Sequence, residues 1–479
     1  METQPIIVWL RRDLRLADNP AMHAARESGA PVVPVFVFDE EEAFAPGGAA
    51  KWWLHRSLRA LSVDLTAAGS RLVLRRGRGA ETVAEIARSL NASAVFWNRR
   101  YAPAHVAADK KLKADLTAAG VEAKSFSAAL LREPWEVETK AGAPFRVYSP
   151  FWKVLRAAGP SREARPSLRK IRGLPKSPFT EDLDSWGLQP VHPDWAWEFA
   201  EVWRPGEAGA HEALKAFLDE TAEYYARDRD RPDREATSRL SPHLAFGEIS
   251  PLQVWRATHA RIEAGELDRE VGEKFLSEIG WREFSYHLLY FNEGLEAAPL
   301  RAEFAALPWR KDKKGFAAWT KGETGFPVVD AGMRQLWRTG WMHNRVRMLV
   351  ASFLVKDLLI PWQDGASWFW DTLVDADPAN NSASWQWVAG CGADAAPFFR
   401  IFNPVTQGEK FDPHGAYVRR FVLELSQAPD KFIHKPWEAP KDDLASVGVT
   451  LGKTYPARIV DHAFARTRAL EAFRSIRKD

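Results

Sequence analysis

The first 130 residues alternate short apolar runs with stretches of helical periodicity, and this alternation limits the fold more than any other feature of the chain. The apolar runs cover residues 6–10, 32–38, 71–75 and 94–97, with a weaker run at 121–127. The helical patterns cover residues 20–27, 49–68, 80–90 and 103–119. Strands that alternate with helices form a parallel sheet covered on both faces. We therefore predict a doubly wound, Rossmann-like α/β domain over residues 1–130.

The predicted sheet carries no recognisable phosphate-binding loop. Sheets of this type bind ligands at the carboxyl ends of their strands. However, no strand is followed by G-x-G-x-x-G, and G-x-x-x-x-G-K-[ST] does not occur. Gly77-Arg78-Gly79 is too short a glycine signal to stand for either motif. This part of the chain therefore predicts a fold without indicating its chemistry.

Residues 131–203 lose this periodicity and are richer in Pro and Gly, which is typical of an interdomain connector. Between residues 156 and 176 the connector carries a basic run, opposed only by Glu163. The run consists of Arg156, Arg162, Arg165, Arg169, Lys170, Arg172 and Lys176. We favour a solvated linker over the alternative of a DNA-binding arm.

Helical periodicity dominates from about residue 206 onward, and no repeat of fixed period is present. The clearest helices are predicted over residues 211–225, 251–264, 271–290, 328–339 and 345–359. We therefore predict that residues 204–479 form a large helical domain.

Composition excludes several classes of protein. With 46% hydrophobic and 27% charged residues, the chain is neither disordered nor fibrous. A single cysteine, Cys391, excludes a disulfide framework and four-cysteine zinc or iron–sulfur sites. A net charge of +3 limits any nucleic-acid site to a local basic patch. The chain lacks a long apolar run and a signal-peptide pattern at Met1–Pro5, so we expect a cytoplasmic protein without a membrane partner.

Two polar segments in the first part of the helical half point to chemistry. Tyr225 precedes Thr237-Ser238-Arg239-Leu240-Ser241, whose hydroxyls and guanidinium could bind a phosphate; a helix N-cap is the alternative. In Glu278-Ile279-Gly280-Trp281-Arg282-Glu283-Phe284, Glu278 and Arg282 are four residues apart and can form an ion pair beside Trp281. In isolation, the second segment would be interpreted as a surface ion pair next to a core tryptophan.

Two further segments follow. In Trp341-Met342-His343-Asn344-Arg345-Val346-Arg347-Met348, the spacing places Asn344, Arg347 and Met348 on one helical face, and His343 by itself indicates a structural role. In the segment from Asp375 to Trp387, the carboxylates of Asp375 and Asp377 could hold a hard cation, accept hydrogen bonds from a ligand or pair with Arg347. The glycine and glutamate of a calcium loop are missing, so we predict no metal site.

These four segments, in this order, resemble the DNA photolyase and cryptochrome family. The resemblance also includes Trp9-Leu10-Arg11-Arg12-Asp13-Leu14-Arg15 and Phe402-Asn403-Pro404-Val405-Thr406-Gln407-Gly408, and it extends from about residue 6 to residue 437. It implies a U-shaped FAD in the helical domain and UV-damaged DNA as the partner. On this resemblance, the cofactor-binding residues would be Tyr225, Thr237, Ser238, Arg239, Leu240, Ser241, Arg282, Trp341, Asn344, Arg347, Asp375, Asp377 and Asn381.

The resemblance also implies residue roles. Asn381 would face the flavin N5, and Arg347, held by Asp375, would stabilise an anionic reduced flavin. The lesion pocket would consist of Glu278, Trp281, Asn344, Met348 and Trp387, with the two tryptophans stacking on flipped-out pyrimidines. Arg229, Arg345 and Gln407 would contact the DNA. Trp385, Trp362 and Trp309 would form an electron-transfer chain from the flavin to the surface.

Within the family, four positions favour repair of cyclobutane pyrimidine dimers. Enzymes for the (6-4) lesion have histidines at the positions of Asn344 and Met348, whereas plant cryptochromes lack Trp281 and have an aspartate at Asn381. The segments 51–58 and 279–283 nevertheless resemble plant cryptochromes, and this mixture is similar to class III bacterial photolyases. Two alternatives are a blue-light cryptochrome receptor without repair activity and a flavin-free, nucleotide-dependent enzyme on the parallel sheet.

The antenna chromophore is predicted from the subclass resemblance alone. A folate, 5,10-methenyltetrahydrofolate, is expected, and a deazaflavin is the alternative. The Asn-Glu pair of the best-known folate class is replaced here by Ala104 and His105, so those contacts are not carried over. The chain ends at Asp479 without a long signalling tail, and we expect a monomer.

Overall fold

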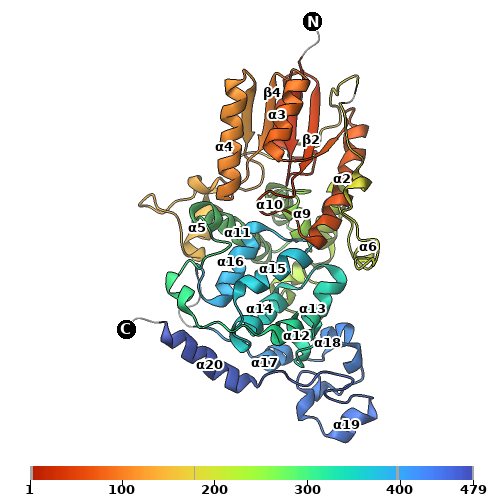
Figure 1. The fold of residues 1–479 in the computed structure, drawn as a ribbon, viewed down its shortest axis with the longest axis vertical. Helices are drawn as coiled ribbons and strands as arrows, with labels where there is room; N and C mark the ends of the chain where they lie inside the picture. The colour runs from red at the N-terminus through yellow and green to blue at the C-terminus, as the bar shows by residue number, and fades with distance from the viewer. Residues whose placement is uncertain (1–3, 177, 395–398, 477–479) are drawn as a thin grey trace.

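A computed structural model describes residues 4–176, 178–394 and 399–476 of the chain. An α/β part forms one end of the molecule, and a larger helical part forms the rest (Figure 1). The predicted fold class is therefore confirmed. The expectations about an N-terminal leader and a C-terminal tail concern residues 1–3 and 477–479 in part, and these lie outside the described residues.

The α/β part is built on a five-stranded parallel sheet with the order β3-β2-β1-β4-β5. Its strands are β1 (Ile6–Leu10), β2 (Val32–Phe38), β3 (Val73–Arg76), β4 (Ala94–Asn98) and β5 (Glu122–Phe126). Ile6 of β1 is in register with Val32 on one side and Ala94 on the other. Because β1 and β2 are buried along their whole length, they have continuous apolar sequences instead of an alternating pattern.

Helices cover both faces of this sheet, as the alternation predicts. Ile6, Val8 and Leu10 pack with residues of α1 (Pro20–Glu27) and α2 (Gly48–Ala67). Ile7 and Trp9, on the opposite face, pack with residues of α3 (Gly79–Ser89) and α4 (Pro103–Ala118). Helix α1 has the predicted bounds, and the Asn19 side chain caps it by accepting a hydrogen bond of 3.2 Å from the Met22 backbone N–H.

The connector packs against the α/β part through apolar residues, while all the side chains of its basic run except Arg162 are exposed to solvent, as expected. Arg162 forms an ion pair with Asp18, whose carboxylate is fully buried, and Arg165 pairs with Glu27 at 2.7 Å. Leu168 and Ile171 are buried in the core of the sheet. The segment also contains α5 (Tyr148–Ala158) and α6 (Phe199–Val202). The ion pairs of Arg156, Arg162 and Arg165 are not visible in the local sequence because their acidic partners lie more than 100 residues away.

The helical part contains most of the predicted helices. Its α-helices are α7 (Glu207–Ala216), α8 (Tyr225–Asp228), α9 (Ser241–Ala245), α10 (Pro251–Glu263), α11 (Arg269–Phe291), α12 (Lys313–Lys321), α13 (Pro327–Thr339), α14 (Asn344–Ser352), α15 (Trp362–Thr372), α16 (Pro378–Ala389), α17 (Pro404–Phe411), α18 (Ala416–Phe421), α19 (Lys441–Ser446) and α20 (His462–Ser475). Two predicted helices are interrupted by π-helical turns, at Phe217–Thr221 and Phe353–Asp357. Apolar spacing does not distinguish such a turn from an α-helical one.

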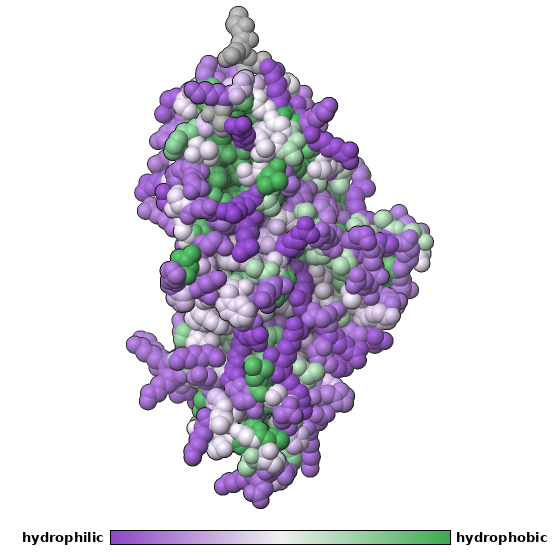
Figure 2. Space-filling view, turned by 90° about the vertical axis from the view of Figure 1, so that its right-hand side faces the viewer, coloured by the Kyte–Doolittle hydropathy of each residue, from purple (hydrophilic) through white to green (hydrophobic). Residues whose placement is uncertain are grey.

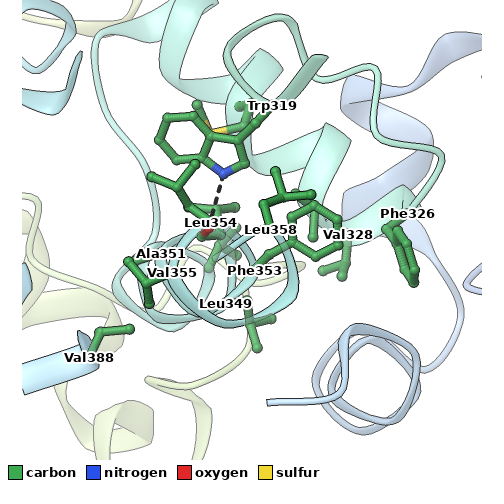
Figure 3. Close-up of a cluster of buried hydrophobic side chains, with 14 of the residues drawn as sticks. Trp319, Phe326, Val328, Leu349, Ala351, Phe353, Leu354, Val355, Leu358 and Val388 are labelled. Atoms are coloured by element: carbon green, nitrogen blue, oxygen red, sulfur yellow. Dashed lines mark hydrogen bonds between the residues drawn. The ribbon is translucent and has the colours of Figure 1, made fainter. Parts of the chain in front are cut away.

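The main core of the helical part surrounds α14 and its π-helical extension (Figure 3). The Trp319 indole N–H donates a hydrogen bond of 2.9 Å to the Val350 carbonyl, drawn as the dashed line in Figure 3. Leu349 and Leu354 are almost fully buried in the same core. This packing fixes the position of α14, so the side chains on its other face are held in place by a rigid element.

The face shown in Figure 2 is mostly hydrophilic, and its apolar side chains form small separate groups. Among the described residues on this face, no broad apolar patch of the kind that marks an obligate interface is visible. In the described part of the chain, no helix combines the length and the hydropathy needed to cross a membrane.

Candidate functional site

A cavity of about 560 Å³ is lined by residues of α11, α14, α15 and α16. Figure 1 shows these four helices in the middle of the molecule. This volume falls within the usual range of cofactor sites. Most residues singled out in the sequence line this cavity: Tyr225, Arg229, Ser238, Leu240, Ser241, Glu278, Trp281, Arg282, Asn344, Arg345, Arg347, Met348, Asp375, Asp377, Asn381, Trp385 and Trp387.

Arg347 and Asp375 form a bidentate ion pair in the cavity wall. The two hydrogen bonds, Nη1 to Oδ1 and Nη2 to Oδ2, measure 3.1 and 2.8 Å, and Arg347 Nε donates to the Met342 carbonyl at 2.7 Å. The Asp375 side chain is only 2% exposed. The pairing suggested by the sequence is therefore confirmed, and it presents a fixed cation to the cavity.

Asp377 caps α16. Its Oδ1 accepts hydrogen bonds from the backbone and side-chain N–H groups of Asn380, both at 2.8 Å, and its Oδ2 accepts one from the Tyr286 hydroxyl at 2.5 Å. Burial raises the pKa of Tyr286 well above its ordinary value, so this phenol stays a donor. Both carboxylates of the segment thus have protein partners, which argues against the cation alternative. The described residues contain no cluster of three metal-ligating side chains.

The ion pair predicted between Glu278 and Arg282 is wrong. Glu278 pairs with Arg229, and Arg282 donates a hydrogen bond of 2.8 Å to the Ala129 carbonyl, which follows β5. Arg282 also lies 3.5 Å from Glu283. The prediction fails because the preferred partners of both side chains come from distant parts of the chain, which the spacing along one helix does not reveal.

Two tryptophans of the cavity are held by contacts on their outer sides. The Trp281 ring stacks on Tyr148 of α5, with centroids 3.7 Å apart and planes inclined by 11°. The Trp387 indole N–H donates a hydrogen bond of 3.1 Å to the Asp394 carbonyl. Both rings are partly exposed in the cavity, so they offer flat apolar surfaces to a planar ligand.

The hydroxyl segment before α9 lies partly in the cavity. Ser238, Leu240 and Ser241 line it, whereas Thr237 and Arg239 do not. No side chain caps α9, so the N-cap alternative is wrong. Arg239 has a positive φ of 51° and lies 5.3 Å from the centre of the Trp341 ring, and the Trp341 indole donates to the Ser241 hydroxyl at 3.2 Å. Trp341 therefore contacts a residue of the cavity wall without lining the cavity itself.

Of the three tryptophans expected in an electron-transfer chain, only Trp385 lines the cavity. A Cβ at Gly365 would overlap the Trp385 ring, so this glycine permits α15 to approach the indole closely. Trp362 lies three residues before Gly365 on α15 and is buried, and Trp309 is partly buried against the same core. Trp319, which the sequence did not single out, contacts Trp385 edge to face with centroids 6.3 Å apart.

A second cavity, of about 700 Å³, opens beside the first. Its basic side chains are Arg227, Arg231, Arg345, Arg400 and Lys410, and Asn403 and Gln407 also line it. The predicted DNA contact Gln407 therefore lies here, and Arg345 lines both cavities. The residues that face both cavities also include Asp230, which sequence reasoning missed because no motif marks it. These cations form a local basic patch, the kind of surface to which the modest net charge limits any nucleic-acid site.

Burial strongly shifts the pKa values of two side chains near the site, His343 and Glu283. His343 caps α14, accepting a hydrogen bond of 3.2 Å from the Arg345 N–H, and burial lowers its pKa to about 4. His343 does not line the cavity, so its predicted structural role is confirmed. Burial raises the pKa of Glu283 to about 8, although Arg282 opposes this effect.

At the expected antenna positions in the α/β part, Ala104 is exposed and His105 contacts the Ala43 carbonyl at 2.8 Å.

The chain matches two family models. Residues 6–168 match the DNA photolyase model, and residues 275–475 match the FAD binding domain of DNA photolyase. The deoxyribodipyrimidine photo-lyase of Agrobacterium fabrum is 53% identical over 484 residues, covering 100% of this chain and 99% of that protein. Cryptochrome-1 of Arabidopsis thaliana is 39% identical, covering 97% of this chain and 70% of that protein.

A solved structure agrees with these sequence relationships. The crystal structure of a bacterial class III photolyase from Agrobacterium tumefaciens superimposes with a TM-score of 0.96 at 52% identity, covering 99% of this chain and 98% of that one. The family models, the relatives and the fold therefore agree with the resemblance seen in the sequence. The chain belongs to the DNA photolyase and cryptochrome family.

Proposed function

We propose that this protein is a deoxyribodipyrimidine photo-lyase, which uses light to split cyclobutane pyrimidine dimers in DNA. The main observation in support is that most of the expected cofactor residues and all five expected lesion residues line one cavity, which shares Arg345 with a basic cavity. Relatives that carry this enzyme name cover the whole chain, among them the protein with 53% identity.

The donor set of the central cavity fits FAD. Arg347 offers a positive charge fixed by Asp375, the hydroxyls of Ser238 and Ser241 can bind polar groups of the nucleotide, and Asn381 offers an amide. When bound, FAD supplies light-driven electron donation. The task of Arg347 is to stabilise negative charge on the isoalloxazine ring, and Asp375 keeps the guanidinium in position for that purpose.

The lesion is bound by the mouth of the same cavity. Trp281 and Trp387 stack against the two flipped-out pyrimidines, while Met348 and Asn344 contact their edges. Glu278 hydrogen-bonds a base and, for this purpose, exchanges its partner Arg229 for the lesion. Dimer splitting moves an electron into the lesion and back with no net proton transfer, so these residues orient the substrate and exclude water.

DNA phosphates are bound by the basic cavity, through Arg345, Gln407 and their neighbours, with Arg229 nearby. Trp385, Trp362 and Trp309 carry electrons from the protein surface to the cofactor, which keeps it in the reduced state. The contact of Trp385 with the helix that begins at Trp362 supports this order.

The competing function is a cryptochrome-type blue-light receptor. Its support is the 39% identity to Cryptochrome-1 of Arabidopsis thaliana. The decisive experiment is illumination of the reduced holoprotein with dimer-containing DNA, followed by quantification of the remaining dimers. Light-dependent loss of the dimers supports the repair enzyme, and an unchanged dimer content under light supports the receptor.

For the antenna chromophore we propose a folate, on the subclass resemblance. A cavity at the carboxyl ends of β1, β2 and β4 has a volume of only about 110 Å³, which is below the usual range for cofactors, so we assign no contacts to it. The absorbance spectrum of the purified protein distinguishes a bound folate from a deazaflavin.

We further propose that the protein acts as a monomer, with an antenna domain over residues 1–130, a connector over 131–203 and a catalytic domain over 204–479. Light scattering at several concentrations tests the monomer. Action on DNA and a single free thiol, Cys391, support the expected cytoplasmic location.

A further inference from the structure

Four side chains of alternating charge connect the two cavities. Glu278 pairs with Arg229, the Arg229 Nε lies 3.9 Å from Asp230 Oδ1, and Asp230 Oδ2 accepts a hydrogen bond of 2.6 Å from Arg345 Nη2. Glu278 is at the lesion end of this chain of charges, and Arg345 is at the DNA end. We call these residues the charge relay: Glu278, Arg229, Asp230 and Arg345.

Asp230 places a negative charge where DNA phosphates would bind. Its side chain is 37% exposed and lines both cavities, whereas that of Arg345 is 18% exposed. Arg345 also lies over the Phe411 ring at 4.5 Å, and its buried Nε has no hydrogen-bond partner among the described residues. Because Asp230 already holds Nη2 of Arg345, a phosphate that binds this nitrogen competes with the carboxylate.

We propose that Asp230 is a specificity-determining residue, which withholds Arg345 from DNA until a lesion occupies the cavity. This inference rests on the proposed function. A flipped-out base that binds Glu278 releases Arg229. Arg229 is adjacent to Asp230 in the chain and already close to its carboxylate, so it replaces Arg345 as the ion-pair partner of Asp230. The freed Arg345 then binds a phosphate.

Undamaged DNA leaves the relay in its resting state. No base enters the cavity, so Glu278 keeps Arg229 and Asp230 keeps Arg345. The phosphate contact is then weaker for undamaged DNA than for damaged DNA. Lesion binding in the central cavity therefore strengthens phosphate binding at Arg345. This dependence is a coupling free energy between the two sites.

The test is the substitution Asp230→Asn, which keeps the size of the side chain and removes its charge. Binding of an undamaged duplex should become roughly three- to fivefold tighter. This factor corresponds to about 1 kcal/mol, which a partly exposed ion pair contributes. The slope of the logarithm of the binding constant for this duplex against the logarithm of the salt concentration should steepen by about 0.9, which is the contribution of one additional phosphate contact. Binding of the dimer-containing duplex should change little, so the damaged-to-undamaged affinity ratio should fall by the same three- to fivefold factor.

Two controls separate this mechanism from a general effect of charge. Glu424→Gln removes a comparable carboxylate, 27% exposed and paired with Arg334 at 2.8 Å, and neither residue lines the central or the basic cavity. It should leave the affinity ratio unchanged. In an Arg345→Gln background, Asp230→Asn should have no further effect, because the cation that it releases is missing. The flavin spectrum and the melting temperature report whether each variant folds and binds its cofactor.

The outcomes are distinct. A reduced affinity ratio that depends on Arg345 supports the relay. An unchanged or increased ratio in Asp230→Asn, or the same effect in Glu424→Gln, overturns it. If wild-type protein binds damaged and undamaged duplexes equally, the proposed repair function itself fails, and this result is visible before any variant is measured.

Discussion

The ring of Trp281 stacks on the ring of Tyr148, with centroids 3.7 Å apart and planes inclined by 11°. Trp281 belongs to α11 and Tyr148 to α5, so the connector between the two parts of the chain helps to hold a residue of the central cavity. Because one face of the indole is covered by Tyr148, the ring is held in one orientation when a base stacks against it.

The first prediction concerns stacking in the lesion pocket. Trp281→Ala should weaken binding of dimer-containing DNA by about 1–3 kcal/mol, the usual contribution of one base–aromatic stack. Binding of an undamaged duplex should change much less, since no base enters the cavity. Fluorescence anisotropy with both duplexes measures this difference. The control is Trp337→Ala on α13, whose ring is 50% exposed and lies outside both cavities. Equal weakening of both duplexes by Trp281→Ala would contradict base flipping.

The second prediction concerns the pair of Arg347 and Asp375. Arg347→Gln leaves the buried Asp375 carboxylate without its cation, so protein stability should fall by roughly 3–5 kcal/mol and FAD should be lost. Adding Asp375→Asn removes the unpaired charge and should restore much of the stability. It should not restore FAD binding, because Arg347, the cation proposed to face the flavin, is still missing. Denaturant unfolding and the flavin content of the purified protein measure the two effects. Full FAD content in the double variant would show that Arg347 does not bind the cofactor.

The third prediction tests the route of electrons to the flavin. Trp385 has two candidate neighbours, because α15 begins at Trp362 and the Trp319 ring lies 6.3 Å away. Trp385→Phe and Trp362→Phe should each slow photoreduction of oxidised FAD by at least about tenfold, which corresponds to about 1.4 kcal/mol in the barrier. Trp319→Phe is the matched control and should retain the wild-type rate. The reverse result, with Trp319→Phe blocked and Trp362→Phe active, would assign the route to Trp319. Chemically reduced Trp385→Phe should still repair DNA.

The fourth prediction concerns pH. Glu283 is buried beside Arg282, and its pKa is raised from an ordinary value of 4.5 to about 8. Between these values the folded protein binds more protons than the unfolded chain, so stability falls as pH rises from about 4.5 to about 8. Glu283→Gln removes this titration. The melting temperature of wild type relative to Glu283→Gln should therefore decrease from pH 5 to pH 8. A constant difference over this range would show that Glu283 is ionised throughout.

Much of the fold follows from local patterns. The start of α1 could be predicted because Asn19 and Pro20 carry the capping signal within the segment itself. The strands β1 and β2 could be predicted because burial on both faces produces continuous apolar sequences. The π-helical turn at Phe353–Asp357 could not, since its apolar residues satisfy the α-helical spacing equally well.

The sequence predicted most of the residues that line the candidate site but fewer of the contacts between them. The pairing of Arg347 with Asp375 follows from the family resemblance and from opposite charges in two polar segments. The pairing of Glu278 with Arg229, the support of Trp281 by Tyr148 and the position of Asp230 depend on tertiary packing between distant segments. Spacing within one helix carries no information about such partners.

The central claim is that the substrate is the cyclobutane dimer. Repair of a (6-4) lesion requires transfer of an oxygen-bearing group, and an acid that titrates near neutral pH assists that step. In the cavity the two relevant positions are Asn344 and Met348, neither of which is such an acid. His343 is adjacent in sequence, but it caps α14, does not line the cavity and has a pKa lowered to about 4 by burial.

The most direct measurement illuminates the reduced holoprotein with two oligonucleotides, one containing a cyclobutane dimer and the other a (6-4) lesion, and quantifies both lesions over time. A parallel reaction in the dark corrects for loss that does not depend on light. The account predicts rapid light-dependent loss of the cyclobutane dimer, with the (6-4) lesion unchanged. Light-dependent loss of the (6-4) lesion, with the cyclobutane dimer unchanged, would contradict it.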